Sequence, residues 1–263
     1  MTPSPLDRLL RWVWPALLLA VLIAAWEIAV RLNDTPRWML PPPSAVATSL
    51  RVDWRLLLEH TRVTFVEVLL GFALAFVAGI LAGIAIDSSR IIERAVYPLL
   101  IASQTIPMVV LAPLLLIWFG YGLLPKVLVA ALVAFFPLAV NTVDGLRAVD
   151  REILALLRSM GAGRWTRFRL AKLPAAMPAI FSGSRIAIAF CVIGAVFGEL
   201  VGAKEGLGYL MERSASQFQT DRVFACILIL AVMGVSLFSI VALLERVLLP
   251  WRRYVTDTAP TDA

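Results

Sequence analysis

Six stretches of this chain are long, apolar and free of charged side chains. Between consecutive charged residues they are Trp12–Trp26, Val68–Ile86, Ala95–Pro125, Val127–Val143, Ile186–Gly198 and Val223–Leu244. A helix rises about 1.5 Å per residue, so about 20 apolar residues cross a hydrocarbon core about 30 Å thick. Val68–Ile86 and Val223–Leu244 meet this length outright, and Ala95–Pro125 and Val127–Val143 supply two more spans. Trp12–Trp26 meets it if extended to Val30, and the fifth stretch meets it as Leu173–Gly198 if Arg185 is tolerated. We therefore expect six membrane spans, at about residues 12–30, 64–86, 97–118, 124–143, 175–199 and 223–246.

The composition favours an all-α, polytopic membrane protein over a soluble one. Apolar residues make up 60% of the chain, whereas soluble domains average about 45–50%. A membrane β-barrel would show short alternating segments instead of continuous runs.

The first run reaches Val30 without a small-x-small cleavage site, so we expect a retained helix and no signal peptide. We expect one membrane domain over residues 1–253 and a polar tail over 254–263.

The basic side chains are distributed unequally between the two sides of the expected membrane domain. The net charge is +6, and with six spans 15 Lys and Arg residues fall on one side and 9 on the other. The richer side contains both termini and the segment Arg147–Lys172. By the positive-inside rule this side is cytoplasmic. This distribution also explains the positive net charge, so the charge does not indicate nucleic acid as a partner.

The sequence shows no arrangement of residues typical of an enzyme. It has no glycine-rich nucleotide loop, no G-x-S-x-G and no H-E-x-x-H. His60 stands alone at the edge of a span, and Cys191 and Cys226 lie inside apolar runs, where cysteine usually packs as a small hydrophobe. We expect no catalytic residue, no metal site and no cofactor bound by this chain.

A few polar side chains lie within or at the ends of the expected spans. Polar groups in a span usually face the bundle interior or a cavity. Such residues either line a translocation path or join helices by hydrogen bonds, and for Glu199 a structural ion pair or cap is a further interpretation. The candidate path residues are Ser103, Gln104, Thr105, Asn141 and Glu199.

Two spans carry small residues at regular intervals. Gly71, Ala75, Gly79 and Gly83 recur every four residues in one, and Gly183, Ala187, Gly194 and Gly198 lie in another. Small residues on one helical face let helices approach closely. We expect these faces to be packing surfaces.

The segment Arg147–Pro178 differs from the spans because it is basic and amphipathic. Arg151–Met160 is expected to form a helix with an apolar side, ended by Gly161-Ala162-Gly163. Arg164–Lys172 is expected to form a second short piece, stopped by Pro174. The segment can either rest on anionic headgroups or dock into a partner protein.

This segment resembles the cytoplasmic coupling loop of ABC importer permeases, the "EAA" loop. The family pattern is E-A-A, three residues, Gly, nine residues, Ile, one residue, Leu-Pro. Gly161 and Leu173-Pro174 match it, whereas Ala155-Leu156-Leu157 takes the E-A-A positions and Ala171 the Ile position. Glu152, one turn earlier, is a candidate replacement for the loop glutamate. The resemblance places ATPase coupling in loop 147–174, at Leu157, Arg158, Met160, Gly161, Arg164, Leu173 and Pro174.

Further motifs resemble permeases of the nitrate/sulfonate/taurine type over about Leu40 to Arg253. They are Leu40-Pro41-Pro42-Pro43, Gly71-Phe72-Ala73-Leu74-Ala75, Ile106-Pro107, Ala112-Pro113-Leu114, Trp118-Phe119-Gly120, Gly206-Leu207-Gly208 and Leu244-Glu245-Arg246. Within that type, the branch that carries pyrimidine precursors of thiamine, or riboflavin, is most similar. Ser103-Gln104-Thr105-Ile106-Pro107, Phe119-Gly120-Tyr121-Gly122 and Phe135-Phe136-Pro137 with Asn141-Thr142-Val143-Asp144-Gly145 carry that similarity.

The resemblance implies a type I ABC importer permease in a bacterial inner membrane. Two permease copies would form the pore, with ATP and Mg bound by separate ATPase subunits and solute delivered by an extracytoplasmic binding protein. The implied solute is a thiamine pyrimidine precursor or a similar heterocycle, with sulfonate, taurine or nitrate as the alternative. A secondary transporter without an ATPase is the competing class. It would show a midplane ionisable residue or interrupted helices in repeated halves.

Overall fold

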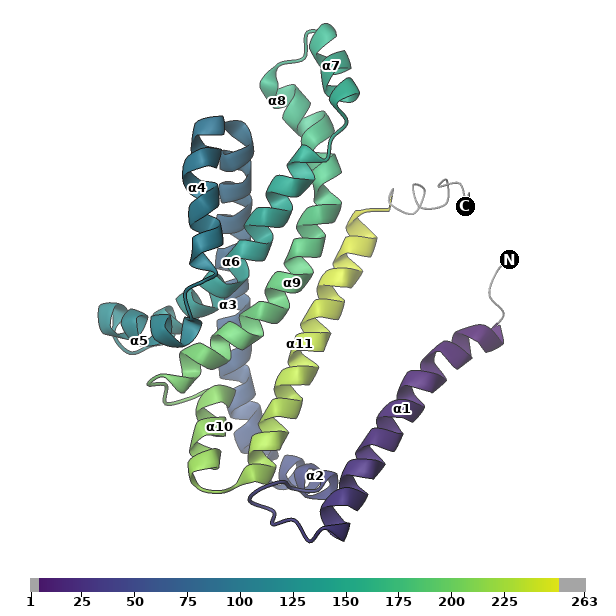
Figure 1. Ribbon diagram of the computed structural model, residues 1–263, viewed down its shortest axis with the longest axis vertical. Coiled ribbons are helices and arrows are strands. Elements are labelled where there is room, and N and C mark those ends of the chain that lie inside the picture. Colours follow the sequence, from purple (N-terminus) through teal and green to yellow (C-terminus); the bar gives the residue numbers. More distant parts are fainter. Residues whose placement is uncertain (1–4, 251–263) are drawn as a thin grey trace.

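The computed structural model describes residues 5–250, with side chains from residue 13 onward. This part of the chain is helical between short connections (Figure 1). Its elements are α1 (Pro5–Leu32), α2 (Pro43–Val52), α3 (Trp54–Ser88), α4 (Arg90–Ser103), α5 (Met108–Phe119), α6 (Leu123–Arg147), α7 (Arg151–Ser159), α8 (Arg164–Arg167), the π-helical turn η1 (Phe168–Lys172), α9 (Leu173–Leu200), α10 (Leu207–Ser216) and α11 (Thr220–Leu248). The expected tail 254–263 lies outside the described residues.

Five helical stretches are long and apolar enough to cross a membrane. They are Val13–Leu32, Trp54–Ser88, Leu123–Arg147, Arg164–Leu200 and Thr220–Leu248. The pair α4 and α5 passes the same test together and supplies a sixth candidate. The prediction of an all-α polytopic protein is therefore confirmed. The helices extend beyond several expected span ends, most of all α3, which begins ten residues before position 64.

The third expected span, 97–118, is not one continuous helix. α4 and α5 are bent by 104° at the break between Ser103 and Met108. Pro107 has an extended backbone, with φ −64° and ψ 125°, and its ring disfavours a helical conformation at the residue before it. The sharp bend sends α5 sideways, away from the long axes of the neighbouring helices (Figure 1).

The core is formed where α6 lies against both α3 and α9 (Figure 1). The two predicted small-residue faces meet α6 from either side, and all eight of their residues are buried. A Cβ added at Gly79 would come within 2.7 Å of Leu138 Cβ, and one at Gly183 within 2.7 Å of Asn141 Cβ. The small residues therefore set how closely the three helices approach, as expected from their spacing.

Arg185 interrupts an apolar run inside α9 and is accommodated by an ion pair. Its Nη2 lies 2.6 Å from Glu245 Oε2 on α11. Its guanidinium also lies 5.9 Å from the ring centroid of Phe238. Pairing offsets the cost of removing both charges from water. This contact joins α9 to α11 within the bundle.

Candidate functional site

The basic loop forms two short helices at one end of the bundle, beyond the ends of α3 and α4 (Figure 1). α7 covers Arg151–Ser159, in agreement with the predicted Arg151–Met160 helix. Asp150 precedes it, and its Oδ1 accepts a 2.8 Å hydrogen bond from the backbone N–H of Glu152. This cap satisfies one of the free amides of the first turn and places a carboxylate at the positive end of the helix.

Gly161 ends α7 as the sequence predicts. Its φ is +80°, a left-handed conformation in which a side chain is strained. The Gly161 N–H donates to Arg158 O at 2.9 Å and the Ala162 N–H donates to Leu157 O at 2.9 Å. These two bonds form a Schellman cap, which reverses the chain so that α8 can return toward the bundle.

α7 presents an apolar face that nothing in the described chain covers. Ile153, Leu156 and Met160 are 49%, 60% and 73% exposed. Leu157, on the border of that face, is half-buried, and Arg158 is exposed on another side of the helix. Three large apolar side chains on one short helix form a surface suited to docking a protein partner.

The second piece of the loop does not stop at Pro174, contrary to the prediction. α8, η1 and α9 follow one another without a break, so Arg164–Leu200 runs as one helical stretch. Pro174 sits in the first turn of α9, directly after the wide π-helical turn of Phe168–Lys172. A proline is tolerated here because the preceding π-helical turn interrupts the regular i→i−4 hydrogen bonds, to which proline supplies no N–H. Arg164 and Pro174 are exposed, and Leu173 is half-buried.

Lys172 fastens this loop to the end of α3. Its Nζ lies 2.6 Å from Asp87 Oδ2. The two side chains are 26% and 11% exposed, so the pair is partly shielded from water. A second, more exposed pair joins Arg147 to Glu93 on α4 at 3.0 Å. The loop is therefore held to two neighbouring helices.

The three adjacent path candidates lie at the break between α4 and α5. Ser103 and Thr105 donate their hydroxyl protons to backbone carbonyls three residues earlier, those of Leu100 and Ala102, each at 2.7 Å. Gln104 is exposed, and its side-chain amide makes no hydrogen bond to any described residue. Its two donor hydrogens and its acceptor oxygen are therefore not used within the described chain.

The other two candidates lie apart from this break. The Asn141 Nδ2 amide donates to Pro137 O at 2.7 Å within α6, and Asn141 packs against Gly183 of α9. Glu199 is completely buried near the end of α9. The structure thus brings Ser103, Gln104 and Thr105 together and leaves Asn141 and Glu199 in helix contacts. The surroundings of Asn141 and of Glu199 favour the interpretation that these side chains join helices over the interpretation that they line a translocation path.

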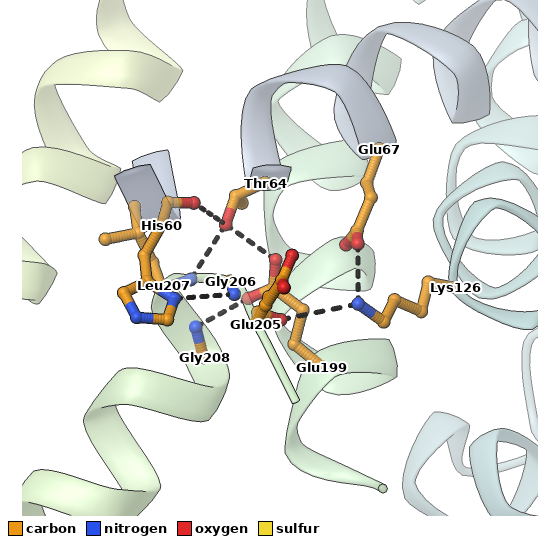
Figure 2. A network of polar contacts seen from close by, with 9 residues as sticks. All are labelled: His60, Thr64, Glu67, Lys126, Glu199, Glu205, Gly206, Leu207 and Gly208. Carbon is orange, nitrogen blue, oxygen red and sulfur yellow. Dashed lines mark hydrogen bonds and ion pairs between the residues drawn. The ribbon is translucent and has the colours of Figure 1, made fainter. Parts of the chain in front are cut away.

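Glu199 belongs to a buried polar network (Figure 2), at the end of the bundle opposite α7 (Figure 1). Its Oε1 accepts a 2.6 Å hydrogen bond from Thr64 Oγ1, and its Oε2 accepts one from the Gly208 N–H. Thr64 Oγ1 also accepts from the Leu207 N–H at 2.8 Å, and His60 Nδ1 accepts from the Gly206 N–H at 2.9 Å. Side chains of α3 and α9 thereby cap the first amides of α10.

A largely buried ion pair lies beside this network. Lys126 Nζ at the start of α6 lies 2.7 Å from Glu67 Oε1, and Glu67 is fully buried. The same ammonium donates to Glu205 O at 3.3 Å (Figure 2). Gly206 has φ +114°, and a Cβ there would overlap the Glu199 carboxylate. The connection from α9 to α10 is therefore held against α3 and α6.

The sequence predicts a role for Glu199 at this end, but it does not reveal the other residues of the network and of the adjoining ion pair. Thr64, Glu67 and Lys126 carried no motif, although a glutamate within an apolar run requires a partner. That requirement was the available signal, but it does not say which distant cation supplies the charge. Among the described residues, no group of three or more His, Cys, Asp or Glu side chains is arranged to hold a metal ion.

Comparison with known proteins identifies the class of chain that carries these features. Residues 75–249 match the family of binding-protein-dependent transport system inner membrane components. The chain belongs to this family. It is the permease subunit of an ABC importer, as the resemblance of its loop predicted.

Curated relatives match this permease over nearly their whole length. The formylaminopyrimidine transport permease ThiX of Halalkalibacterium halodurans is 41% identical over 91% of this chain and 96% of its own. The riboflavin transport permease RibX of Chloroflexus aurantiacus is 39% identical over 94% of this chain and 95% of its own. The taurine transport permease TauC of Escherichia coli is 29% identical over 93% of this chain and 94% of its own. The predicted permease type and its pyrimidine/riboflavin branch are both confirmed.

Solved structures agree on the fold. An amino acid ABC transporter with histidines matches at a TM-score of 0.61 and 19% identity, over 76% of this chain and 97% of that chain. The MetNI methionine ABC transporter in an inward-facing form matches at a TM-score of 0.61 and 20% identity, also over 76% of this chain and 97% of that chain. The permease therefore has the type I importer fold that the sequence predicted.

Proposed function

We propose that this permease carries a small polar heterocycle, of the class of thiamine pyrimidine precursors. The observation that carries the proposal is its similarity, end to end, to a permease named for formylaminopyrimidine. A riboflavin permease, whose solute is also a nitrogen heterocycle, is nearly as similar. The free amide of Gln104 fits such a solute, because it can donate to a ring nitrogen and accept from an amino group.

Sulfonate, taurine or nitrate is the second candidate class of solute. Relatives named for aliphatic sulfonates and taurine are similar over most of the chain, at lower identity. An anionic solute would favour a cation along its path. The break between α4 and α5, residues 103–107, contains no basic residue, so its chemistry favours the neutral heterocycle.

Coupling to ATP hydrolysis is assigned to the exposed apolar face of α7. ATP and Mg would be bound by a separate ATPase subunit, and docking would bury Ile153, Leu156 and Met160. The Schellman cap at Gly161 and the Lys172–Asp87 pair would carry the movement into α9 and α3. A rigid helix held at both ends transmits such a displacement better than a mobile loop.

The complete importer would contain two permease copies, two ATPase subunits and an extracytoplasmic binding protein. In this orientation α7 and both termini are cytoplasmic, because the basic residues concentrate on that side. Figure 1 agrees with an even number of crossings, since α11 runs toward the end of the bundle that carries α7. The end with α2 and α10 would then face the binding protein.

Reconstituted uptake tests this function. The permease, its ATPase and its binding protein would be placed in liposomes, and uptake of labelled formylaminopyrimidine would be followed with and without ATP. We expect ATP-dependent uptake that excess unlabelled pyrimidine suppresses and excess taurine does not. Suppression by taurine would assign the sulfonate class instead. Uptake driven by an ion gradient without ATP would contradict the coupling to an ATPase.

A further inference from the structure

A basic cavity of about 750 Å³ lies between the coupling loop and the adjoining end of α3. Four cationic side chains line it, and Asp87 is the one carboxylate in the lining. The cations are Arg158 of α7, Arg164 and Arg167 of α8, and Lys172 of η1. No ion pair within the described chain accounts for the three arginine side chains in this lining.

The charge of the cavity is not balanced internally. Asp87 is already paired with Lys172 at 2.6 Å. Within the part of the chain that the structure describes, Arg158 and Arg164 have no acidic side chain within ion-pair distance. Arg167 uses Nε for a 3.4 Å contact with Gly163 O, which leaves its other donors available. Three guanidinium groups around one cavity create a positive potential that attracts an anion.

The cavity lies at the end of the expected second span, 64–86, where α3 should leave the hydrocarbon core. Asp87 is the first charged residue after the run Val68–Ile86. Its bond to Lys172 places η1 at the same level. Trp165 lines the cavity and is 71% exposed, and Leu170, one turn later, is 63% exposed. Exposed Trp and Leu side chains beside basic residues are typical of the headgroup region of a membrane.

The cavity is also on a different side of α7 from the docking face. Leu154 and Arg158 line the cavity. Residues of an α-helix are separated by about 100°, so this side is distinct from that of Leu156 and Met160. A partner that docks on the exposed apolar face therefore need not cover the side of α7 that lines the cavity.

We propose that this cavity binds the phosphate group of an anionic phospholipid. Guanidinium groups form paired hydrogen bonds with phosphate oxygens, and basic pockets between membrane helices suit such headgroups. Ile84, Leu154 and Phe168 provide apolar lining for the parts of the lipid next to the headgroup. A bound lipid would hold α8 and α7 at a set distance from the end of α3. The site depends on membrane insertion, and it needs neither the solute nor the ATPase to be as proposed.

Lipid retention by the purified full-length permease tests the site. Native mass spectrometry would give apparent affinities for phosphatidylglycerol and for phosphatidylcholine with the same acyl chains. Both lipids carry a phosphate, but the quaternary ammonium of phosphatidylcholine is repelled by the three guanidinium groups of the lining. We therefore expect phosphatidylglycerol to bind about tenfold more tightly. The double variant Arg158→Gln/Arg164→Gln should lose about that factor. The control Arg151→Gln/Arg169→Gln removes the same charge from exposed positions outside the lining and should retain wild-type affinity.

Four results would overturn the proposal. Equal affinity of the wild type for the two lipids would show that the cavity does not select an anion. Equal losses in the two double variants would show diffuse attraction instead of a site. Displacement of the lipid by millimolar inorganic phosphate would assign the cavity to a soluble anion. Displacement by the purified ATPase would assign it to the docking surface. The lipid comparison uses the wild type alone, so it stands even if a variant fails to fold.

Discussion

Thr64 on α3 and Glu199 on α9 are 135 residues apart in the sequence, and a 2.6 Å hydrogen bond from Thr64 Oγ1 to Glu199 Oε1 joins them. The same hydroxyl accepts from the Leu207 N–H at 2.8 Å. One side chain therefore connects α3, α9 and the first turn of α10. Because all three residues are buried, loss of the hydroxyl removes the donor to Glu199 Oε1 and the acceptor of the Leu207 N–H where water does not readily replace them.

Thr64→Val should loosen α10 from the bundle. Valine has the same shape but cannot satisfy Glu199 or the Leu207 N–H, and we expect a loss of about 1–3 kcal/mol. Thr61→Val is the matched control, since Thr61 bonds only to Leu57 O in its own helix. Thermal unfolding in detergent and proteolysis of the 201–206 connection would measure both. Equal stability of the two variants would contradict the connecting role of Thr64.

Gly161→Asp should abolish coupling without preventing insertion. Nothing lies within 4 Å of a Cβ at Gly161, so steric overlap is not the cause. The φ of +80° makes any side chain unfavourable by about 1 kcal/mol or more, and a carboxylate beside the docking face adds a desolvation cost. We expect at least about a tenfold loss of ATPase binding and of ATP-driven uptake.

Gly163→Asp controls for the added charge. Gly163 is two residues away, is equally unhindered, and has an ordinary φ of −65°. Pull-down with the ATPase and reconstituted uptake should show a much smaller defect in this variant. If Gly161→Asp couples like the wild type, the loop merely rests on lipid.

Lys172→Met should destabilise the attachment of the loop to α3. It leaves Asp87, only 11% exposed, without its cation, and we expect a loss of about 1–2 kcal/mol, between the values for exposed and buried pairs. Arg147→Met breaks the more exposed pair with Glu93 and should cost about 0–1 kcal/mol. Thermal unfolding would compare the stabilities of the two variants. The charge exchange Asp87→Lys/Lys172→Asp should restore part of the stability that Lys172→Met loses. A larger effect at Arg147 would refute the ranking.

Gln104→Leu should reduce uptake several-fold while leaving assembly with the ATPase intact. The exposed amide is expected to bond the solute, and leucine retains the bulk but neither donates nor accepts. Ser103→Ala is the control, because that hydroxyl is occupied by Leu100 O. Initial uptake rates and ATPase pull-down would be measured together. Unchanged uptake, or failed assembly, would show that Gln104 serves packing alone.

Cysteine labelling should place the coupling loop in the cytoplasm. Ala162→Cys, in a background without Cys191 and Cys226, is expected to resist a membrane-impermeant thiol reagent in intact cells and to react after lysis. Lys204→Cys, on the connection between α9 and α10, should react from outside. The reverse pattern would invert the topology and remove α7 from the reach of any ATPase.

Local features of the sequence determined much of this protein. The length of the apolar runs set the spans, because the hydrocarbon core demands about 20 residues per crossing. Gly161 and its neighbours determined the end of α7, since a left-handed cap depends on the residue that occupies it. The four-residue spacing of Gly71 to Gly83 indicated a packing face that the structure buries. The Gly and Leu-Pro spacing of the loop pointed to the family.

Only the tertiary structure decided which distant groups meet. Pro107 predicted a kink, but the 104° turn of α5 depends on the surfaces that α4 and α5 find. The charges of Glu67 and Arg185 within apolar runs required partners, yet only the packing of α3, α6, α9 and α11 selected Lys126 and Glu245. The basic cavity beside Asp87 likewise exists because α8 and η1 continue into α9 and return Arg164 to the end of α3. Periodicity and local propensity act within a few turns of helix, whereas these pairings depend on the relative placement of whole helices.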